Sequence, residues 1–364
     1  MRFSSELYSS PIEDATIPGI DVLSAKMISA ANHNYRLGDR LSKFTFGPVR
    51  SRRLGMSLGV NNVPYKTCSY SCIYCQLGRT GNFSIERREF YRWEDIVEDV
   101  LKSVEELEGK LDYVTFVPDG EPLLDKSIGK EIEEIKKGIS FPIAVITNSS
   151  LLFLEECRRD LSEADLVSLK VDAFNERVWR TVNRPHPRLK LNEILYGIEE
   201  FSKDYRGKII TETMLVKGFN EERVELEKIA SFLQRLNPHR AYISIPVRPP
   251  AESYATPPEP EKLVEAYEVF REKLGEGKVE LLNLPEPPPP SAHGDPKSWL
   301  LSVTSVHPLR LKYALSSLRT ISEDPEKVIS ELEDGQWIRI VEYMGEKFVV
   351  RWFKDIRKLE RLSD

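Results

Sequence analysis

The feature that most restricts the fold of this chain is a regular alternation of apolar segments and amphipathic helical segments between residues 58 and 274. Short apolar runs predict buried strands at residues 58–63, 113–117, 142–148, 165–172, 209–216 and 241–247. Apolar residues recur at helical spacing between them, which predicts helices at residues 94–108, 126–137, 192–203, 221–236 and 260–274. Strands that alternate with helices form βαβ units around a parallel sheet. The pattern therefore predicts an α/β fold, an open or partial barrel with its active site at the carboxyl ends of the strands.

The regions outside this pattern divide the chain further. Residues 1–45 show no clear periodicity, and we interpret them as an N-terminal extension that precedes a barrel over residues 46–283. Residues 284–296 begin with the stretch LPEPPPP, and consecutive prolines favour an extended polyproline II conformation that acts as a stiff spacer. We therefore predict a linker at residues 284–296 and a separate domain over residues 297–364.

This last domain has its own pattern. Residues 308–319 and 325–333 have helical periodicity, and residues 336–353 alternate with a period of two. The alternation reverses around Met344 and Gly345, which predicts a β-hairpin. Two helices followed by a hairpin predict a winged-helix-like domain.

The composition restricts the location and the partners of the chain. It has 364 residues and a formal net charge of −6, from 52 Lys and Arg against 58 Asp and Glu. This charge argues against a protein that coats nucleic acid non-specifically, but it allows a local basic patch. No apolar run approaches the roughly 20 residues that span a bilayer. We therefore expect a cytoplasmic protein without a membrane partner, and in that compartment clustered cysteines bind metal or act in catalysis.

Three of the four cysteines, Cys68, Cys72 and Cys75, lie in the stretch TCSYSCIYCQLG. Zinc normally takes four ligands, and His33, His186 and the distant Cys157 lack finger spacing, although a fold could still supply one of them. An iron–sulfur cube bound by three thiolates keeps one iron without a protein ligand. A small molecule with an amine and a carboxylate can chelate that iron, so the missing thiol suits an enzyme better than an electron carrier.

The cysteine spacing C-x3-C-x2-C, with the aromatic Tyr74 just before Cys75, resembles the radical S-adenosylmethionine (radical SAM) superfamily. The resemblance implies a partial (β/α)6 barrel, a [4Fe-4S] cluster on the three cysteines, and S-adenosyl-L-methionine (SAM) as the second cofactor. It also implies that the cluster reduces SAM to methionine and a 5′-deoxyadenosyl radical, which abstracts hydrogen from a substrate. The residue at the position of Tyr74 packs near the adenine in relatives.

A second stretch, YVTFVPDGEPLLD, resembles the Gly-Gly-Glu segment of the same superfamily, with Asp119 in place of the first glycine. The resemblance implies that Gly120, Glu121 and Pro122 bind the amino group of SAM. A plain turn is the alternative, because Asp-Gly is a strong turn dipeptide.

Period-two alternation places polar side chains on one face of the later strands, and helices must cover the apolar face. Lys170 and Asp172 share the polar face of one strand, and we predict that they contact the carboxylate and the ribose of SAM; a buried ion pair is the alternative. Glu212 is ambiguous between the two faces. Two further residues complete the predicted SAM-binding set, Asn148 at the end of the third strand and Arg248 after the last one. No catalytic residue is assigned.

The stretches at residues 46–80, 171–186 and 215–222 resemble iron–sulfur oxidoreductases related to the wyosine-base synthase of tRNA, over about residues 44–255. Wyosine synthases carry three further N-terminal cysteines for a second cluster, and this chain has none there. We therefore predict a single cluster and interpret Cys157 as a core residue.

The expected activity is radical modification of a nucleoside in RNA, with an electron donor such as ferredoxin or flavodoxin. A peptide or a small metabolite is the alternative substrate, and a non-enzymatic, metal-stabilised nucleic-acid-binding protein is the alternative class. Two basic patches could contact a phosphate or an acidic substrate. They comprise Arg50, Arg52, Arg53 and Lys66 before the cysteines, and Arg177, Arg180, Arg184, His186 and Arg188 after the fourth strand.

Overall fold

The computed structural model describes residues 35–37, 40–107, 111–284, 288–289, 292, 294–304 and 307–352. Most of the predicted N-terminal extension, parts of the predicted linker and the end of the C-terminal region lie outside the described residues. Within the described residues, no helix has both the length and the apolar character needed to cross a membrane.

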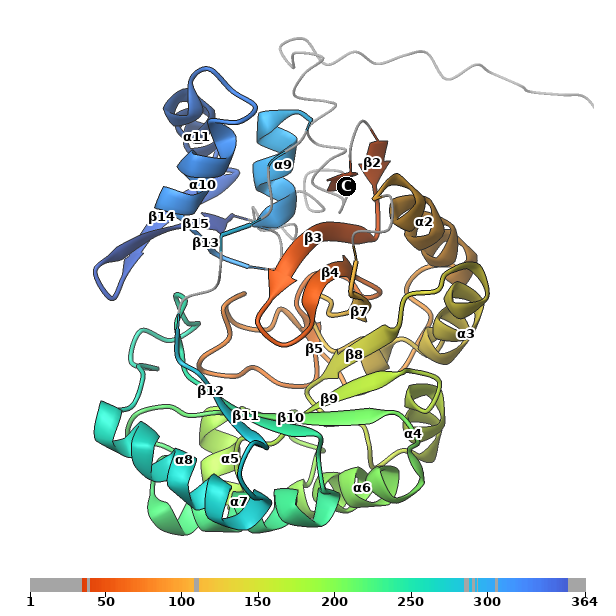
Figure 1. Ribbon diagram of the computed structural model, residues 1–364, viewed down its shortest axis with the longest axis vertical. Coiled ribbons are helices and arrows are strands. Elements are labelled where there is room, and N and C mark those ends of the chain that lie inside the picture. Colours follow the sequence, from red (N-terminus) through yellow and green to blue (C-terminus); the bar gives the residue numbers. More distant parts are fainter. Residues whose placement is uncertain are drawn as a thin grey trace, which may run out of the picture.

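An eight-stranded sheet in the order β12-β11-β10-β9-β8-β7-β4-β3 forms the centre of the larger part of the molecule (Figure 1). Its strands are β3 (Thr45–Ser51), β4 (Gly55–Val60), β7 (Tyr113–Phe116), β8 (Ile143–Thr147), β9 (Leu166–Lys170), β10 (Lys208–Met214), β11 (Arg240–Ser244) and β12 (Val279–Leu282). All neighbouring strands from β4 to β12 pair in parallel, and β3 alone pairs antiparallel, with β4. The predicted α/β fold class with a mostly parallel sheet is confirmed.

Helices cover the outer face of the sheet, as Figure 1 shows. They are α2 (Trp93–Glu106), α3 (Ile128–Gly138), α4 (Glu155–Leu161), α5 (Glu176–Val182), α6 (Leu191–Asp204), α7 (Arg223–Leu236) and α8 (Pro260–Leu274). Their apolar stripes pack against strand residues such as Val114, Val145 and Val167 in one large core. Burying each aliphatic side chain of that size contributes about 1.5–3 kcal/mol. Cys157 is fully buried in the same core, where we expected it.

The inner face of the sheet has two layers. Near the amino ends of the strands, Ala144, Ile210 and Tyr242 form a small apolar cluster that Leu54, from the turn between β3 and β4, closes. Farther along the same face, polar residues such as Glu212 take their place, two positions after Ile210. Because side chains alternate between the two faces of a strand, these polar residues lie on the inner face near the carboxyl ends of the strands. Any polar chemistry of the barrel would therefore take place there.

The two edge strands of the incomplete barrel lie close enough to be bridged. The Arg52 guanidinium, from the turn after β3, donates hydrogen bonds to the carbonyl oxygens of Leu282 (2.8 Å) and Leu284 (2.9 Å). Leu282 is the last residue of β12, so Arg52 joins the two ends of the sheet order.

The remaining described elements form a C-terminal module, defined here as residues 294–304 and 307–352. It contains α9 (Pro296–Val303), β13 (Leu309–Arg310), α10 (Leu311–Leu318), α11 (Pro325–Asp334), β14 (Ile338–Tyr343) and β15 (Glu346–Arg351). Its three strands form an antiparallel sheet in the order β13-β15-β14 around a separate core. The predicted hairpin is present, with left-handed residues Met344 and Gly345 at its turn. The winged-helix assignment and the domain boundaries remain predictions.

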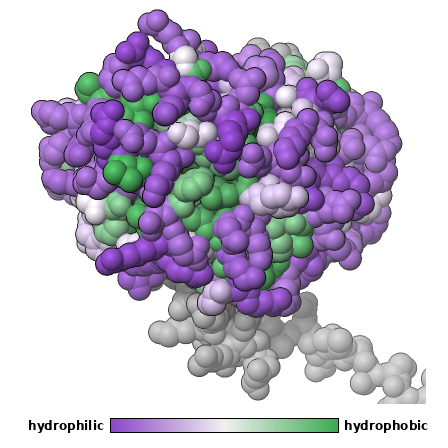
Figure 2. All heavy atoms as spheres, turned by 90° about the horizontal axis from the view of Figure 1, so that it is seen from below, coloured by the Kyte–Doolittle hydropathy of each residue, from purple (hydrophilic) through white to green (hydrophobic). Residues whose placement is uncertain are grey.

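The module packs against the barrel. α9 contacts β3 and the short strand β1 (Tyr35–Leu37), which pairs with β2 (Arg40–Ser42). The Tyr343 hydroxyl donates a hydrogen bond to the carbonyl oxygen of Pro246, in the segment that follows β11 (2.9 Å). A view from below shows a mainly hydrophilic surface with a hydrophobic area near its centre (Figure 2).

Candidate functional site

The three clustered cysteines lie in the segment that follows β4, where the short strands β5 (Thr67–Cys68) and β6 (Asn82–Phe83) pair in parallel. All three cysteines are half-buried and line one cavity. Arg79 fixes the segment from its far end, because its guanidinium makes two hydrogen bonds to the Glu252 carboxylate (2.7 and 2.9 Å). The three thiols therefore lie together in a loop whose far end is held by Arg79.

Each of the three thiols has its own nitrogen donor. The Lys66 ammonium lies 3.3 Å from the Cys75 sulfur. The Asn148 amide lies 3.4 Å from the Cys68 sulfur, and the Asn183 amide lies 3.5 Å from the Cys72 sulfur. Hydrogen bonds to the sulfurs are among the interactions by which proteins tune iron–sulfur clusters.

Burial dominates the protonation of these thiols. It raises the pKa of Cys68 to about 11 and the pKa of Cys72 to about 12. Burial alone would lower the pKa of Lys66, but the neighbouring cysteines, Cys75 first, raise it. A positive charge beside the sulfurs favours their thiolate forms, which are the forms that bind metal.

The residues fit an iron–sulfur cluster better than a single ion. Across the part of the chain that the structure describes, no three His, Cys, Asp or Glu side chains are arranged to hold one metal ion. A cubane makes a different demand, because each thiolate binds a different iron. Three thiols that share one loop, line one cavity and have nitrogen donors suit that demand.

The segment that resembles Gly-Gly-Glu packs directly against the cysteine loop. A Cβ atom on Gly120 would lie 1.8 Å from the carbonyl oxygen of Thr67, so only glycine fits there. The Glu121 amide donates to that same oxygen (3.0 Å), and the Lys66 amide donates to the carbonyl oxygen of Asp119 (3.0 Å). The two motifs found in the sequence thus form one unit, joined backbone to backbone.

Glu121 faces the protein and not the cavity. Its carboxylate accepts hydrogen bonds from the Leu123 backbone N–H (3.1 Å), the Thr147 hydroxyl (2.6 Å) and the Asn148 backbone N–H (2.7 Å). Burial raises its pKa to about 7 even though these bonds lower it. Glu121 and Pro122 are both buried, and neither lines the cavity. Glu121 therefore fixes its segment to the end of β8, and a contact of this segment with SAM remains a prediction.

Polar residues of the inner face form a hydrogen-bonded network beside the cysteines. The Lys170 ammonium lies 2.9 Å from the Glu212 carboxylate and 3.6 Å from the Asp172 carboxylate. The Tyr74 hydroxyl donates to Asp172, and the Asn183 amide donates to the same carboxylate (2.7 Å). Burial lowers the pKa of Lys170, while Asp172 acts in the opposite direction. The register resolves the ambiguity of Glu212, which lies on the inner face opposite Lys170.

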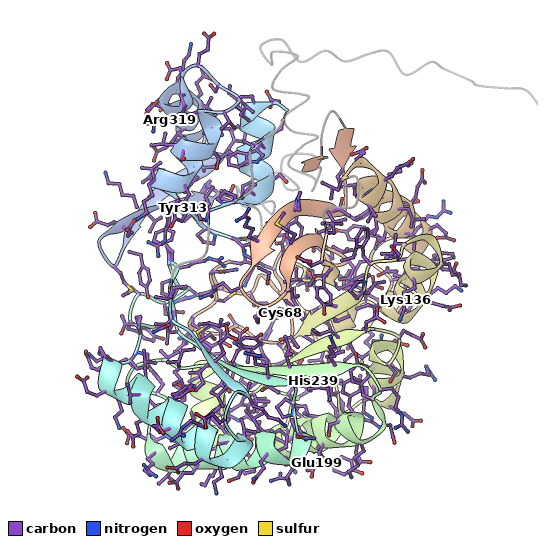
Figure 3. The ribbon with its side chains drawn as sticks, viewed as in Figure 1. Cys68, Lys136, Glu199, His239, Tyr313 and Arg319 are labelled. Carbon is purple, nitrogen blue, oxygen red and sulfur yellow. The ribbon has the colours of Figure 1, made fainter. Side chains whose placement is uncertain are left out.

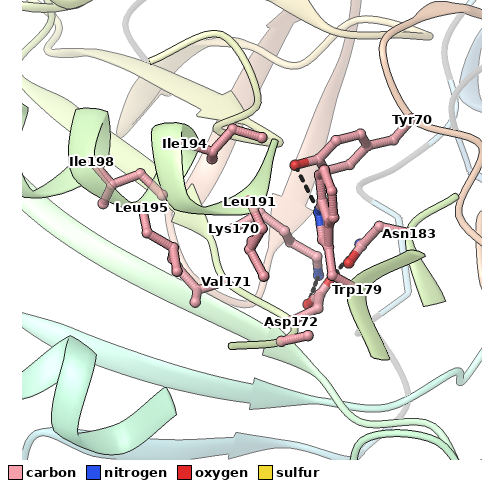
Figure 4. Close-up of a pocket in the computed structure, with 11 residues that line it drawn as sticks. Tyr70, Lys170, Val171, Asp172, Trp179, Asn183, Leu191, Ile194, Leu195 and Ile198 are labelled. Carbon is pink, nitrogen blue, oxygen red and sulfur yellow. Dashed lines mark hydrogen bonds and ion pairs between the residues drawn. The ribbon is translucent and has the colours of Figure 1, made fainter. Parts of the chain in front are cut away.

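Asp172 lies on the buried side of this network, away from the large cavity. Its side chain is fully buried and borders a small neighbouring cavity together with Tyr70 and Trp179 (Figure 4). The Trp179 indole donates a hydrogen bond to the Tyr70 hydroxyl (3.1 Å) in that cavity. Asp172 thereby holds Tyr74 and Lys170 in place, and the predicted contact between Asp172 and ribose remains a prediction.

Arg53 is a member of the site that sequence reasoning noted only as part of a basic patch. Its guanidinium forms an ion pair with Glu212 inside the cavity. Burial lowers the pKa of Arg53 to about 10, and the neighbouring cations Arg52 and Arg248 add to this effect, partly offset by Tyr242. Arg52, Arg53 and Arg248 therefore lie close enough in the cavity lining to affect one another's charge.

The shared cavity has a volume of about 390 Å³. It is lined by Cys68, Cys72, Cys75, Tyr74, Gly120, Asn148, Lys170 and Arg248 from the predicted set. The C-terminal module adds His307, Arg310 and Tyr313 to the lining, and Figure 3 shows Tyr313 on the side of the module that faces the barrel. Sequence reasoning missed these module residues and Asn183, because no local pattern signals a contact across a hundred or more residues.

The two predicted basic patches have different environments. Arg50, Arg52, Arg53 and Lys66 line the cavity. In the other patch, Arg184 pairs with Glu252 (2.5 Å) and Arg180 with Glu176 (2.7 Å). His186 packs its ring edge-on against Phe83, with 5.2 Å between the ring centroids. Ion pairs already occupy much of this second patch, so the first one is the better candidate for an anionic ligand.

Comparison with known proteins finds similarity to one protein family and to several individual proteins. The family model of the Radical SAM superfamily matches residues 62–232. The chain is 43% identical over 314 residues to UPF0026 protein MJ1312 of Methanocaldococcus jannaschii, covering 85% of this chain and 96% of that protein. It is 25% identical over 192 residues to a probable dual-specificity RNA methyltransferase RlmN of Fervidobacterium nodosum, covering 50% of this chain and 52% of that protein. Among solved structures, TYW1 with a lysine-pyruvate adduct matches with a TM-score of 0.45 and 15% identity, covering 59% of this chain and 73% of that chain.

Proposed function

Since this chain belongs to the radical SAM superfamily, we propose that it binds one [4Fe-4S] cluster through Cys68, Cys72 and Cys75 and cleaves SAM reductively to modify a nucleoside in RNA. Membership confirms the predicted enzyme class and its two cofactors, SAM and a [4Fe-4S] cluster. The single-cluster assignment, the residue roles and the substrate are our proposal. The observation that carries it is the convergence of the three thiols with Lys170 and Tyr74 on one cavity.

The chain's own residues would bind and orient the cofactors. When bound and reduced, the cluster and SAM together supply a 5′-deoxyadenosyl radical, which takes a hydrogen atom from the substrate. Lys66 would balance the negative charge of the thiolates, since it lies 3.3 Å from the Cys75 sulfur. Lys170 is placed to bind the carboxylate of SAM. This contact would loosen the ion pair between Lys170 and Glu212. The inward-facing residues of the module would keep bulk water from the cavity.

Two observations support an RNA substrate. The chain matches a probable RNA methyltransferase along about half of its length. Arginines gather along the cavity, and arginine suits phosphate contact. The proposal also includes an external electron donor such as ferredoxin or flavodoxin, a cytoplasmic location, and division of the chain into a barrel at 46–283, a linker at 284–296 and a winged-helix-like domain at 297–364.

Anaerobic purification and reconstitution test the proposal. The wild-type protein should be brown, should contain about four irons per chain, and should release 5′-deoxyadenosine when SAM and dithionite are added. Cys75→Ala should lose both the colour and the cleavage. Cys157→Ala is the matched control, because Cys157 is buried in the core away from the cavity, and it should keep both. A colourless zinc protein that is inert to SAM, or a full cluster in Cys75→Ala, would contradict the assignment.

The substrate class needs a separate experiment. Modified nucleosides in RNA from cells with and without the gene should differ by at least one nucleoside. An unchanged nucleoside profile would count against RNA and would leave the cofactor assignment in place.

A further inference from the structure

The cavity beside the cysteines contains more positive than negative side chains. Its basic lining residues are Arg50, Arg52, Arg53, Lys66, Lys170, Arg248 and Arg310, and its acidic ones are Asp119 and Glu212. Burial raises the pKa of Asp119 to about 7, so even this carboxyl is only partly ionised near neutral pH. Such an excess of cations in a partly buried site is unfavourable unless an anion enters it.

Several of these cations already have a role. Lys66 contacts the Cys75 sulfur, and Lys170 pairs with Glu212. Arg53 pairs with the same glutamate, and Arg52 bridges the sheet edges. The other arginines of the lining are Arg50, Arg248 and Arg310.

Arg310 has a buried hydrogen-bond donor without an acceptor among the described residues. Its side chain is only 9% exposed, and its charge is opposed by Glu346 at 3.4 Å. The guanidinium also lies over the Phe348 ring, 4.9 Å from the ring centroid. Among the described residues, its Nε atom is buried without a hydrogen-bond partner. A buried N–H without an acceptor costs about 1–3 kcal/mol, so an acceptor group placed here would be stabilising.

Arg248 connects the barrel to the same region. Its guanidinium donates to the Gln76 side-chain oxygen (2.5 Å) and lies 3.2 Å from Nδ1 of His307. The Gln76 amide nitrogen is 2.9 Å from the same His307 atom. Gln76 directly follows Cys75, so one small cluster joins the cysteine loop, the end of β11 and the module.

We propose that Arg248 and Arg310 bind a phosphate group of the substrate, in a subsite shared between the barrel and the C-terminal module. This inference rests on the proposed function and extends it from the cofactors to the substrate. Phosphate is favoured over carboxylate because a phosphate monoester carries up to two negative charges and several acceptor oxygens. Two guanidinium groups can therefore contact it at once, each with two donors.

The shared location gives the module a role in substrate binding. Arg310 is the last residue of β13 and His307 lies just before that strand, and Tyr343 holds the module to the segment after β11. A substrate bound here would touch both parts of the chain. The phosphate could belong to a free nucleotide or to an RNA strand, and both present the same chemistry to the two arginines.

Calorimetric titration of the full-length, anaerobically reconstituted protein with inorganic pyrophosphate tests the subsite. Arg310→Gln should weaken pyrophosphate binding at least tenfold, and Arg310→Lys should weaken it less. Arg248→Gln, on the barrel side, should weaken binding as Arg310→Gln does, which guards against a purely local folding defect in the module. Arg319→Gln is the matched control, because Arg319 is 65% exposed at the outer end of the module (Figure 3) and should bind within twofold of wild type. No pyrophosphate binding by the wild type, or equal binding by Arg310→Gln and Arg319→Gln, would overturn the inference.

Further titrations distinguish the source of the phosphate. Tighter binding of uridine monophosphate than of a short oligouridylate with a 5′-hydroxyl would assign a free nucleotide, and the reverse would assign RNA. Uridine is the blank, and binding equal to that of the monophosphate would overturn the inference. SAM cleavage measured on the same samples separates the two claims. Cleavage without anion binding removes only the phosphate subsite. Anion binding without cleavage removes the proposed function, and with it the assignment of the bound phosphate to a substrate of that reaction.

Discussion

The contact between Gly120 and the cysteine loop gives a prediction whose size follows from the geometry. An alanine Cβ at this position would lie 1.8 Å from the Thr67 carbonyl oxygen, whereas ordinary contacts begin at 3.4 Å. The two segments must therefore separate by about 1.6 Å, which breaks the 3.0 Å hydrogen bond from the Glu121 amide to the same oxygen. Overpacking costs about 1–3 kcal/mol, and the lost bond adds about 1 kcal/mol.

Gly120→Ala should thus lower the free energy of unfolding by about 2–4 kcal/mol. Because Thr67 directly precedes Cys68, the same displacement should reduce the iron bound after anaerobic reconstitution. Gly81→Ala is the matched control in the same loop, since a Cβ there would have its nearest neighbour, the Lys66 Cβ, at 4.0 Å. The assays are urea unfolding of the metal-free protein under reducing conditions and iron content per chain. If Gly120→Ala matched Gly81→Ala in both, the proposed packing of the two motifs would be wrong.

Three further substitutions test other parts of the structure. Glu212→Gln leaves the Lys170 ammonium without its nearest carboxylate and should lower the free energy of unfolding by about 3 kcal/mol in urea titrations; an unchanged midpoint would refute the ion pair. Burial raises the pKa of Asp125 to about 6 and that of Glu131 well above its usual range, so their contribution is most favourable below about pH 4 and is lost as the pH rises through 6 and beyond. Thermal unfolding of Glu131→Gln should accordingly show a weaker loss of stability from pH 4 to 8 than the wild type, and parallel curves would count against the raised pKa of Glu131. Glu252→Gln weakens the anchor of the cysteine loop by about 1 kcal/mol and should speed iron loss to a chelator; an unchanged rate would mean that the anchor does not support the cluster.

The sequence predicted the regular part of the fold because long helices and strands carry a strong periodic pattern. The helix predicted at residues 260–274 is α8 with the same bounds, and the one predicted at 94–108 is α2 at Trp93–Glu106. β12 was missed because four residues, VELL, are too few to show alternation. The segment predicted as one helix at 308–319 begins with β13, whose pairing with β15 is a long-range contact that no local pattern reveals.

The candidate site divides in the same way. The cysteines and the Gly120 segment could be found because short motifs with fixed spacing lie on single loops. Asn148 could be assigned to the site because it ends a predicted strand, but its contact with the Cys68 sulfur could not be predicted. Asn183 and its contact with the Cys72 sulfur were missed, because it approaches from an element far along the chain. The same holds for Arg310, which reaches the cavity only because the module packs against the barrel. Tertiary packing, and not local sequence, selects these residues.

The central claim is that the cluster has one iron without a protein ligand, which SAM occupies. Mössbauer spectroscopy of protein reconstituted with ⁵⁷Fe, before and after addition of SAM, tests this most directly. One iron in four should change its isomer shift when SAM binds, while the three irons held by Cys68, Cys72 and Cys75 should keep theirs. A spectrum that SAM leaves unchanged, with a side chain of the protein on the fourth iron, would contradict it.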